Sequence, residues 1–124
     1  MSVLANVGDV LAMCARQFPN KIGAGDLDRE MTFAQWYGRS CRLANALLGL
    51  GLVKGDRVCV LAYNAVEWLE IYAAAALAGV VAVPVNFRLT APEIRYIVEN
   101  CEARALIVQE ELVGAIEGAD LPVP

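Results

Sequence analysis

Three short uncharged runs, apolar apart from one proline, constrain the fold more than any other feature of this sequence. Each is four to six residues long and is bounded by turn residues, which is typical of strands covered on both faces of a sheet. Two stretches with helical patterning separate them. This alternation predicts βαβ units, and so an α/β fold with a parallel β-sheet and flanking helices. The three runs are residues 58–62, 80–85 and 105–108.

An amphipathic helix and a short hairpin are expected before the first strand. Apolar residues recur at helical spacing from Leu4 to Phe18, and Pro19 ends the pattern. The glycine-punctuated segment 21–31 predicts a β-hairpin with its turn near residues 26–28. We expect residues 1–124 to form a single incomplete domain, in which residues 109–124 are a weakly structured tail.

Three sequence signals of the capping-box type predict helix starts. In a capping box the first side chain accepts from the amide three residues on, and the fourth side chain accepts from the first amide. Each signal is followed by a helical stretch, and Pro92 falls in the first turn of the last one, where its missing N–H costs nothing. Pro84 and the turn after it are expected to end the second strand. The boxes pair Thr32 with Gln35, Asn64 with Glu67, and Thr90 with Glu93.

The composition is unusually apolar for so short a chain. Hydrophobic residues make up 58% of it, charged residues 19%, and the mean hydropathy is +0.49. The longest uncharged stretch, residues 71–87, is shorter than the ~20 apolar residues of a spanning helix and contains Gly79 and Pro84. We therefore expect a soluble, cytoplasmic chain with no transmembrane segment. Its excess apolar surface would pack against another part of a longer protein or against a second copy.

The residue types needed for catalysis are scarce. The chain has no histidine, and its serines and threonines are Ser2, Ser40 and the two capping threonines, so no nucleophile–base pair can be assembled. Four scattered cysteines without a Cys-x-x-Cys pair indicate reduced thiols rather than a zinc site. The net charge of −4 argues against a nucleic-acid partner. No catalytic, cofactor-binding or metal-binding residue is predicted.

Three features leave a functional alternative open beside the structural one. Asp26, Asp28 and Glu30 alternate along the hairpin, where a solvated surface is favoured over a cation site. Segment 54–56, Lys-Gly-Asp, is favoured as a turn over a phosphate site because a strand follows it. Arg88 follows the second strand, at the edge where open α/β sheets bind ligands, although a loop arginine commonly has no special role.

Several of these segments, in this order and spacing, resemble the opening of adenylate-forming acyl-CoA synthetases of the fatty-acid or aryl-acid type. The resemblance extends over about residues 4–108. It implies a parent enzyme that joins a carboxylic acid to AMP using ATP and Mg²⁺ and passes the acyl group to CoA. The segments are Thr-Phe-Ala-Gln at 32–35, Gly-Leu-Val-Lys-Gly-Asp-Arg-Val at 51–58, Asn64 with Glu67, the run 78–86, and Arg-Leu-Thr at 88–90.

The same resemblance implies that this segment is inert alone. The family's phosphate loop, its motifs for adenine, ribose and Mg²⁺, its hinge and its C-terminal lysine lie downstream, and nothing here corresponds to them. Some relatives place a basic residue near position 78 to meet the 3′-phosphate of CoA, but this chain has Ala78. A stand-alone interaction module is the alternative, and a flavodoxin-like small-ligand binder is a third reading based on fold pattern alone.

Overall fold

A computed structural model describes residues 6–124, which form two compact units. Unit 1 comprises the described residues up to Lys54 together with Asn64–Gly79. Unit 2 comprises Gly55–Tyr63 and Val80–Pro124. The expectation of one incomplete domain with a weakly structured tail stays a prediction.

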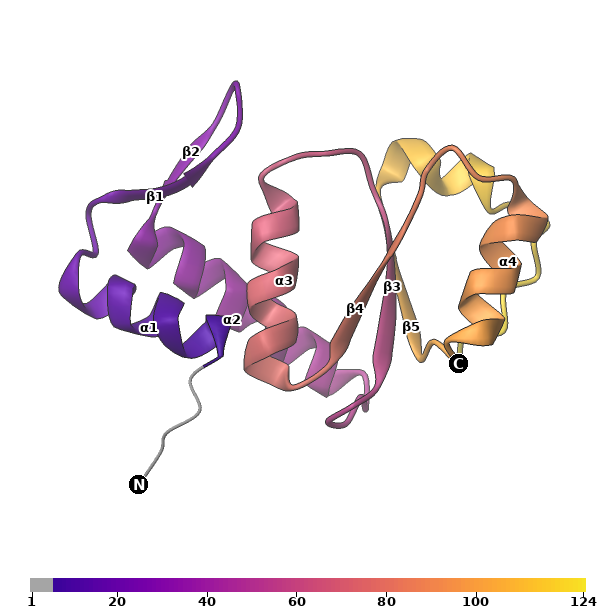
Figure 1. Cartoon of the computed structure of the whole chain (residues 1–124), viewed down its shortest axis with the longest axis horizontal. Helices are drawn as coiled ribbons and strands as arrows, with labels where there is room; N and C mark the ends of the chain where they lie inside the picture. Colours follow the sequence, from indigo (N-terminus) through magenta and orange to yellow (C-terminus); the bar gives the residue numbers. More distant parts are fainter. Residues whose placement is uncertain (1–5) are drawn as a thin grey trace. The chain divides into compact units, whose positions relative to one another are not determined.

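Unit 1 contains three helices and a hairpin (Figure 1). The hairpin strands are antiparallel, as predicted from the glycine-punctuated segment. Helix α2 packs against both α1 and α3, and α1 also contacts α3. The elements are α1 (Val7–Gln17), β1 (Ile22–Gly25), β2 (Glu30–Thr32), α2 (Phe33–Gly49) and α3 (Glu67–Ala78).

Helix α1 begins at a capping box that the sequence pattern did not reveal. The Asn6 side chain accepts from the Asp9 amide at 3.0 Å, and Asp9 accepts from the Asn6 amide at 3.1 Å. A side chain at Gly8 would come within 2.9 Å of Leu77, so a glycine lets α1 approach α3 closely. Leu4, the predicted first residue of the apolar stripe, lies outside the described residues, as does Ser2.

The start of α3 differs from the prediction. No capping box joins Asn64 to Glu67, because the helix begins at Glu67 and its N-cap is Val66, in a helical conformation. The Leu69 amide bonds back three residues to the Val66 carbonyl at 3.0 Å, so a tight turn leads into the helix. The Glu67 carboxylate accepts from Arg29 on the hairpin instead. The Glu67 side chain therefore has a partner in a distant segment of the chain.

Gly79 ends α3 in the left-handed conformation, with φ of 76°. Replacing Gly79 with alanine should lower the free energy of unfolding by about 1–2 kcal/mol, since a Cβ is strained at this φ and would approach Lys54 Cγ to 3.2 Å. Gly49→Ala is the matched control. Gly49 lies in the last turn of α2 with open space around it, so this change should stabilise by up to about 1 kcal/mol. Urea titrations followed by circular dichroism measure both, and equal effects of the same sign would contradict the prediction.

Unit 2 contains the predicted parallel sheet. Its strand order is β4-β3-β5, so the first strand of the three is central and the other two pair with it on either side. A βαβ connection through α4 joins β4 to β5, and a short 3₁₀ helix follows β5. The elements are β3 (Arg57–Leu61), β4 (Val81–Val85), α4 (Ala91–Asn100), β5 (Ala105–Val108) and the 3₁₀ helix Glu110–Ala115.

Pro84 lies inside β4, opposite Val60, and does not end the strand as predicted. The Val81 amide donates to the Asp56 carbonyl at 2.8 Å, so alternate residues from Val81 on donate toward β3. Pro84 has the other parity, which directs its missing N–H away from β3. A proline is tolerated at such an edge because no ladder hydrogen bond to β3 is lost.

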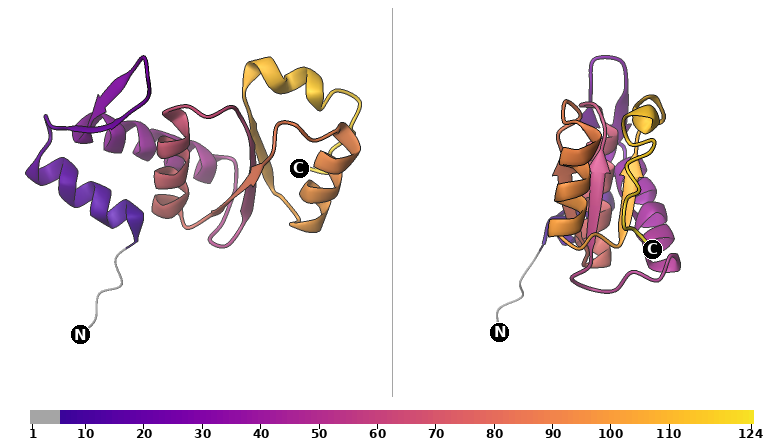
Figure 2. Two further views of the ribbon diagram at one scale, coloured as in Figure 1. Left: turned by 45° about the horizontal axis from the view of Figure 1, so that its top comes forward. Right: turned by 90° about the vertical axis from the view of Figure 1, so that its right-hand side faces the viewer.

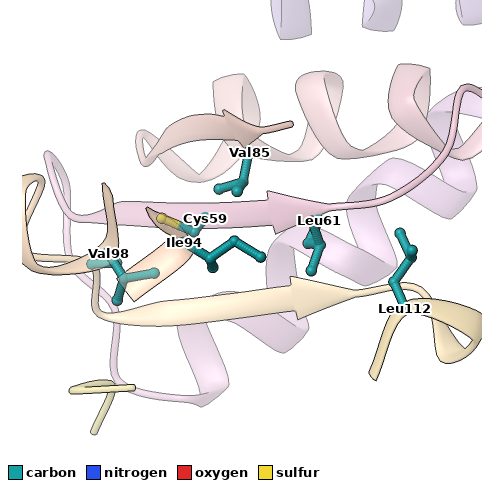
Figure 3. Packing of buried hydrophobic residues seen from close by; sticks show 7 residues of the cluster. Cys59, Leu61, Val85, Ile94, Val98 and Leu112 are labelled. Carbon is teal, nitrogen blue, oxygen red and sulfur yellow. The ribbon is translucent and has the colours of Figure 1, made fainter. Parts of the chain in front are cut away.

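The core of unit 2 lies between the sheet and α4. Cys59 and Leu61 alternate along β3 with Val58 and Val60, and this alternation directs the first pair toward α4 (Figure 3). Figure 2 shows α4, in orange, and the segment after β5, in yellow, beside the strands of this sheet. Cys59, Leu61, Ile94 and Val98 are fully buried, and Val85 and Leu112 lie at the margins of this cluster. The cluster is Cys59, Leu61, Val85, Ile94, Val98, Ala103 and Leu112.

Candidate functional site

The carboxyl ends of the three parallel strands bring together aromatic, amide and cationic side chains in unit 2. The rings of Tyr63 and Phe87 meet edge to face with centroids 4.7 Å apart, and the Arg88 guanidinium lies 5.3 Å from the Phe87 ring centre. Gln109 Oε1 accepts from the Tyr63 amide at 2.9 Å. The Arg88 amide donates to Asn86 Oδ1, also at 2.9 Å. The arginine chosen from the sequence thus lies at the expected edge, beside rings that sequence reasoning missed.

This edge carries groups suited to binding. A guanidinium and ring faces can hold a planar or anionic group. The Arg88 guanidinium beside the Phe87 ring, with Tyr63 next to that ring, provides such a combination.

A second candidate is a cavity of about 620 Å³ in unit 1, between the hairpin and helices α2 and α3. Three arginines line it, but two are already engaged: Arg29 by Glu67 and Arg39 by Glu70. The cavity is therefore nearly balanced in charge, and no excess of one sign selects a ligand. Its lining residues are Arg29, Glu30, Met31, Ala34, Gln35, Gly38, Arg39, Arg42, Val66 and Glu70.

The hairpin turn is tied to the start of α3 by an ionic network beside this cavity. Arg29 binds both carboxylate oxygens of Glu67, with Nη2 2.8 Å from Oε2, and its Nη2 also lies 3.1 Å from Asp26. The Asp26 carboxylate accepts from the backbone amides of Asp28, Arg29 and Val66. These bonds, first that of the Asp28 amide, lower the pKa of Asp26 to about 2. The Arg29 hydrogen bonds lower the pKa of Glu67.

Acidification should weaken unit 1 through this network. A carboxyl group whose pKa is lower in the folded state than in the unfolded state stabilises the fold. The contribution is complete above the unfolded-state pKa of ~3.9 and is lost as the pH falls toward the folded-state pKa. For Asp26 this interval runs from about pH 4 down to about 2. Asp26→Asn should therefore lower the urea midpoint at pH 7 but have little effect at pH 2. Asp28→Asn is the control, because Asp28 enters the network only through its backbone amide, which the change keeps. A pH-independent gap for Asp26→Asn would contradict the assignment.

Helix N-termini are where the phosphates of a nucleotide would bind, because free amides and the helix dipole attract anions there. In α1, α2 and α4 a side chain of the chain itself occupies one of these amides, and α3 opens with two carboxylates, which repel an anion. The groups are Asn6 with Asp9, Thr32 with Gln35, Thr90 with Glu93, and Glu67 with Glu70. These local acceptors and charges disfavour a phosphate at the described helix N-termini.

The nucleophilic side chains of the described region are placed in structural roles. Ser40 is fully buried and donates to the Trp36 carbonyl at 2.7 Å, as its position on the apolar face predicted. All four cysteines are free thiols, and burial raises the pKa of Cys59 to about 12. Within residues 6–124 no three acidic or cysteine side chains converge as a metal site would require, and no helix is long and apolar enough to cross a bilayer.

The described residues form an α/β segment whose parallel sheet carries Arg88 and Phe87 beyond the end of β4. The chain belongs to the family of AMP-binding enzymes, whose model matches residues 11–122. This confirms the family resemblance drawn from the ordered motifs. The match continues beyond residue 108, where the resemblance seen in the motifs ended.

Individual relatives give the same assignment. The chain is 39% identical over 89 residues to fatty acid–[acyl-carrier-protein] ligase ScoC of Streptomyces coeruleorubidus, covering 72% of this chain and 17% of ScoC. It is also similar to the anthranilate CoA ligase AuaEII solved with anthranoyl-AMP: 35% identity, TM-score 0.85, 98% of this chain and 24% of that one. The N-terminal domain of FACL13 from Mycobacterium tuberculosis matches 98% of this chain, with 29% identity, a TM-score of 0.77 and 38% of that chain covered.

The relatives are much longer than this chain, which spans about a sixth of the length of ScoC. The chain is therefore homologous to the N-terminal part of acyl-CoA and fatty-acid ligases.

Proposed function

We propose that this chain is the N-terminal part of an AMP-forming acyl-CoA synthetase. The whole enzyme would join a carboxylic or fatty acid to CoA, consuming ATP and releasing AMP and diphosphate. The observation that carries the proposal is the match, over nearly the whole chain, to the anthranilate CoA ligase solved with its acyl-adenylate. The fatty-acid ligase ScoC supports the same substrate class.

Within such an enzyme this segment would act as scaffold. The N-termini of α2 and α4 carry capping boxes of the chain's own side chains, and Ser40 and Cys59 are buried, so ATP and Mg²⁺ would be held by other parts of the protein. In the whole enzyme, ATP would activate the carboxylic acid by converting it to an adenylate. The contribution of this chain would be a folded sheet that carries an exposed Arg88 and a half-buried Phe87 beyond the end of β4. Alone it would not catalyse the reaction.

A segment exchange tests the proposal. Residues 11–122 would replace the matching segment of ScoC, and acyl transfer from the fatty acid that ScoC itself accepts to the carrier protein, with ATP, would be measured. The chimera should keep activity within about tenfold of ScoC, because core residues tolerate exchange when pattern and volume are kept. The 124-residue chain and ScoC lacking the segment should both give no product. A folded but inactive chimera would contradict the proposal.

The alternative is a stand-alone interaction module of the same fold. One observation favours it: Val7, Val10 and Met13 lie three residues apart along α1 and are 61%, 48% and 43% exposed. This stripe could pack against the rest of a ligase or against a second copy. The segment exchange separates the two candidates, since a chain specialised only for association would not support acyl transfer in the chimera.

A further inference from the structure

Two thiols meet in the core of unit 2. Cys59 lies in the central strand β3, and Cys101 caps the C-terminal end of α4. Their sulfur atoms are 3.5 Å apart, although 42 residues separate them in sequence. A disulfide bond is ~2.05 Å long, so the sulfurs are about 1.5 Å from bonding distance. Sequence spacing gave no sign of this pair.

We propose that Cys59 and Cys101 form a disulfide on exposure to hydrogen peroxide, which makes the pair a redox-responsive cross-link between β3 and α4.

The backbone around Cys101 holds the two sulfurs together. The Cys101 amide donates to the Ile97 carbonyl at 3.0 Å, which fixes the last turn of α4. The Cys101 carbonyl accepts from Arg57 Nε at 2.7 Å, and Arg57 is the first residue of the same strand that carries Cys59. The Ala103 amide, just beyond, donates to the Val98 carbonyl. The contact is therefore set by bonds between the helix end and the strand, and not by two mobile side chains.

The two thiols differ in access to an oxidant, and this difference sets the order of reaction. Cys59 is fully buried, and its pKa of about 12 keeps it protonated at neutral pH. Cys101 is only half-buried, so a small peroxide can reach it first. Cys101 would become a sulfenic acid as the peroxide O–O bond breaks and one water leaves. The Cys59 sulfur then attacks the Cys101 sulfur, and its proton leaves with the hydroxyl group as a second water.

The electron balance closes with the peroxide alone. Two thiols are oxidised to one disulfide, which releases two electrons and two protons. The peroxide takes up both and is reduced to two waters. No metal or other cofactor is needed, and a thiol such as dithiothreitol reverses the reaction by exchange.

Thiol counting and peptide mapping test the proposal on the 124-residue chain. After treatment with a few equivalents of hydrogen peroxide, alkylation under denaturing conditions should find two free thiols in place of four. The intact mass should fall by two hydrogen atoms. Tryptic digestion should link peptide 58–88, which contains Cys59, to peptide 96–104, which contains Cys101. Dithiothreitol should restore four thiols.

Variants identify the pair. Cys101→Ser should abolish the cross-link, whereas the double change of Cys14 and Cys41 to serine, both in unit 1, should leave it intact. Because Cys59 lies in the core, Cys59→Ala is also used: it keeps an apolar side chain and should leave Cys101 as a sulfenic acid that dimedone labels. Four surviving thiols in the folded chain, a link through Cys14 or Cys41, or direct oxidation of Cys101 to sulfinic acid in the unsubstituted chain would each overturn the proposal.

Discussion

Ile94→Ala is expected to lower the free energy of unfolding by about 2–5 kcal/mol, the range for removing a large buried aliphatic side chain. Ile94 lies on α4, is completely buried, and packs against the sheet with Cys59, Leu61 and Val98 (Figure 3). The loss is large because two free-energy contributions add: the burial free energy lost with the removed carbon atoms, and the cost of the cavity that remains. For a chain of this size that is a substantial part of its total stability.

Two further substitutions make the prediction specific: one at another position of α4, and a milder one at position 94 itself. Tyr96→Ala changes a side chain that is 68% exposed, so it should cost well under 1 kcal/mol. Ile94→Val removes a single methylene and should cost about 0.5–1.5 kcal/mol. Urea titration followed by circular dichroism measures all three. If Ile94→Ala cost no more than Tyr96→Ala, the core described for unit 2 would be wrong.

The parts of the fold that sequence predicted are those with a local or periodic cause. The three uncharged runs became the three strands, as their lengths and flanking turns predicted. Cover on both faces was right only for the central strand β3, because β4 exposes Val81 and Pro84 and β5 is half-buried. The capping boxes at Thr32 and Thr90 formed as predicted, since each needs only four consecutive residues. Each of these features is settled within a few positions along the chain.

The parts that sequence could not predict depend on partners far along the chain. Asn64 did not cap α3, because the helix begins only at Glu67, whose carboxylate is bound by Arg29, 38 residues away. Neither charge has a pattern that points to the other. The same holds for the sulfur contact of Cys59 and Cys101. Pro84 was predicted to end its strand. A proline is tolerated in an edge strand, but which strand lies at the edge is a property of the assembled sheet and cannot be seen in the sequence.

The candidate site was predicted only in part, for the same reason. Topology alone places Arg88 at the carboxyl edge of a parallel sheet, and the structure has it there. Its aromatic neighbour is Phe87, and the ring that Phe87 meets, Tyr63, follows a different strand, so the ring pair emerges only when β3 and β4 align. The unit 1 cavity likewise combines the hairpin with two helices, and no single segment carries its pattern.

Arg39→Met should also have a large effect, because it would leave a buried carboxylate without its counter-ion. The Glu70 side chain is 10% exposed, and its Oε1 lies 2.7 Å from Arg39 Nε. Removing one partner of a fully buried pair typically costs about 3–5 kcal/mol. Arg39 is 48% exposed, however, so water can replace part of its interaction. We therefore expect a loss of about 1–3 kcal/mol.

Arg42→Met is the matched control for this pair. Arg42 lies one turn further along α2 and lines the same cavity, and the change removes the same charge and keeps a similar apolar stem. If the effect of Arg39 came only from net charge or helix propensity, both variants would lose the same stability. Adding Glu70→Gln to each variant completes the comparison: it should recover part of the loss in Arg39→Met, because a neutral amide is cheaper to leave unpaired than a carboxylate, and none in Arg42→Met. Equal losses, or no recovery, would show that Glu70 does not depend on Arg39.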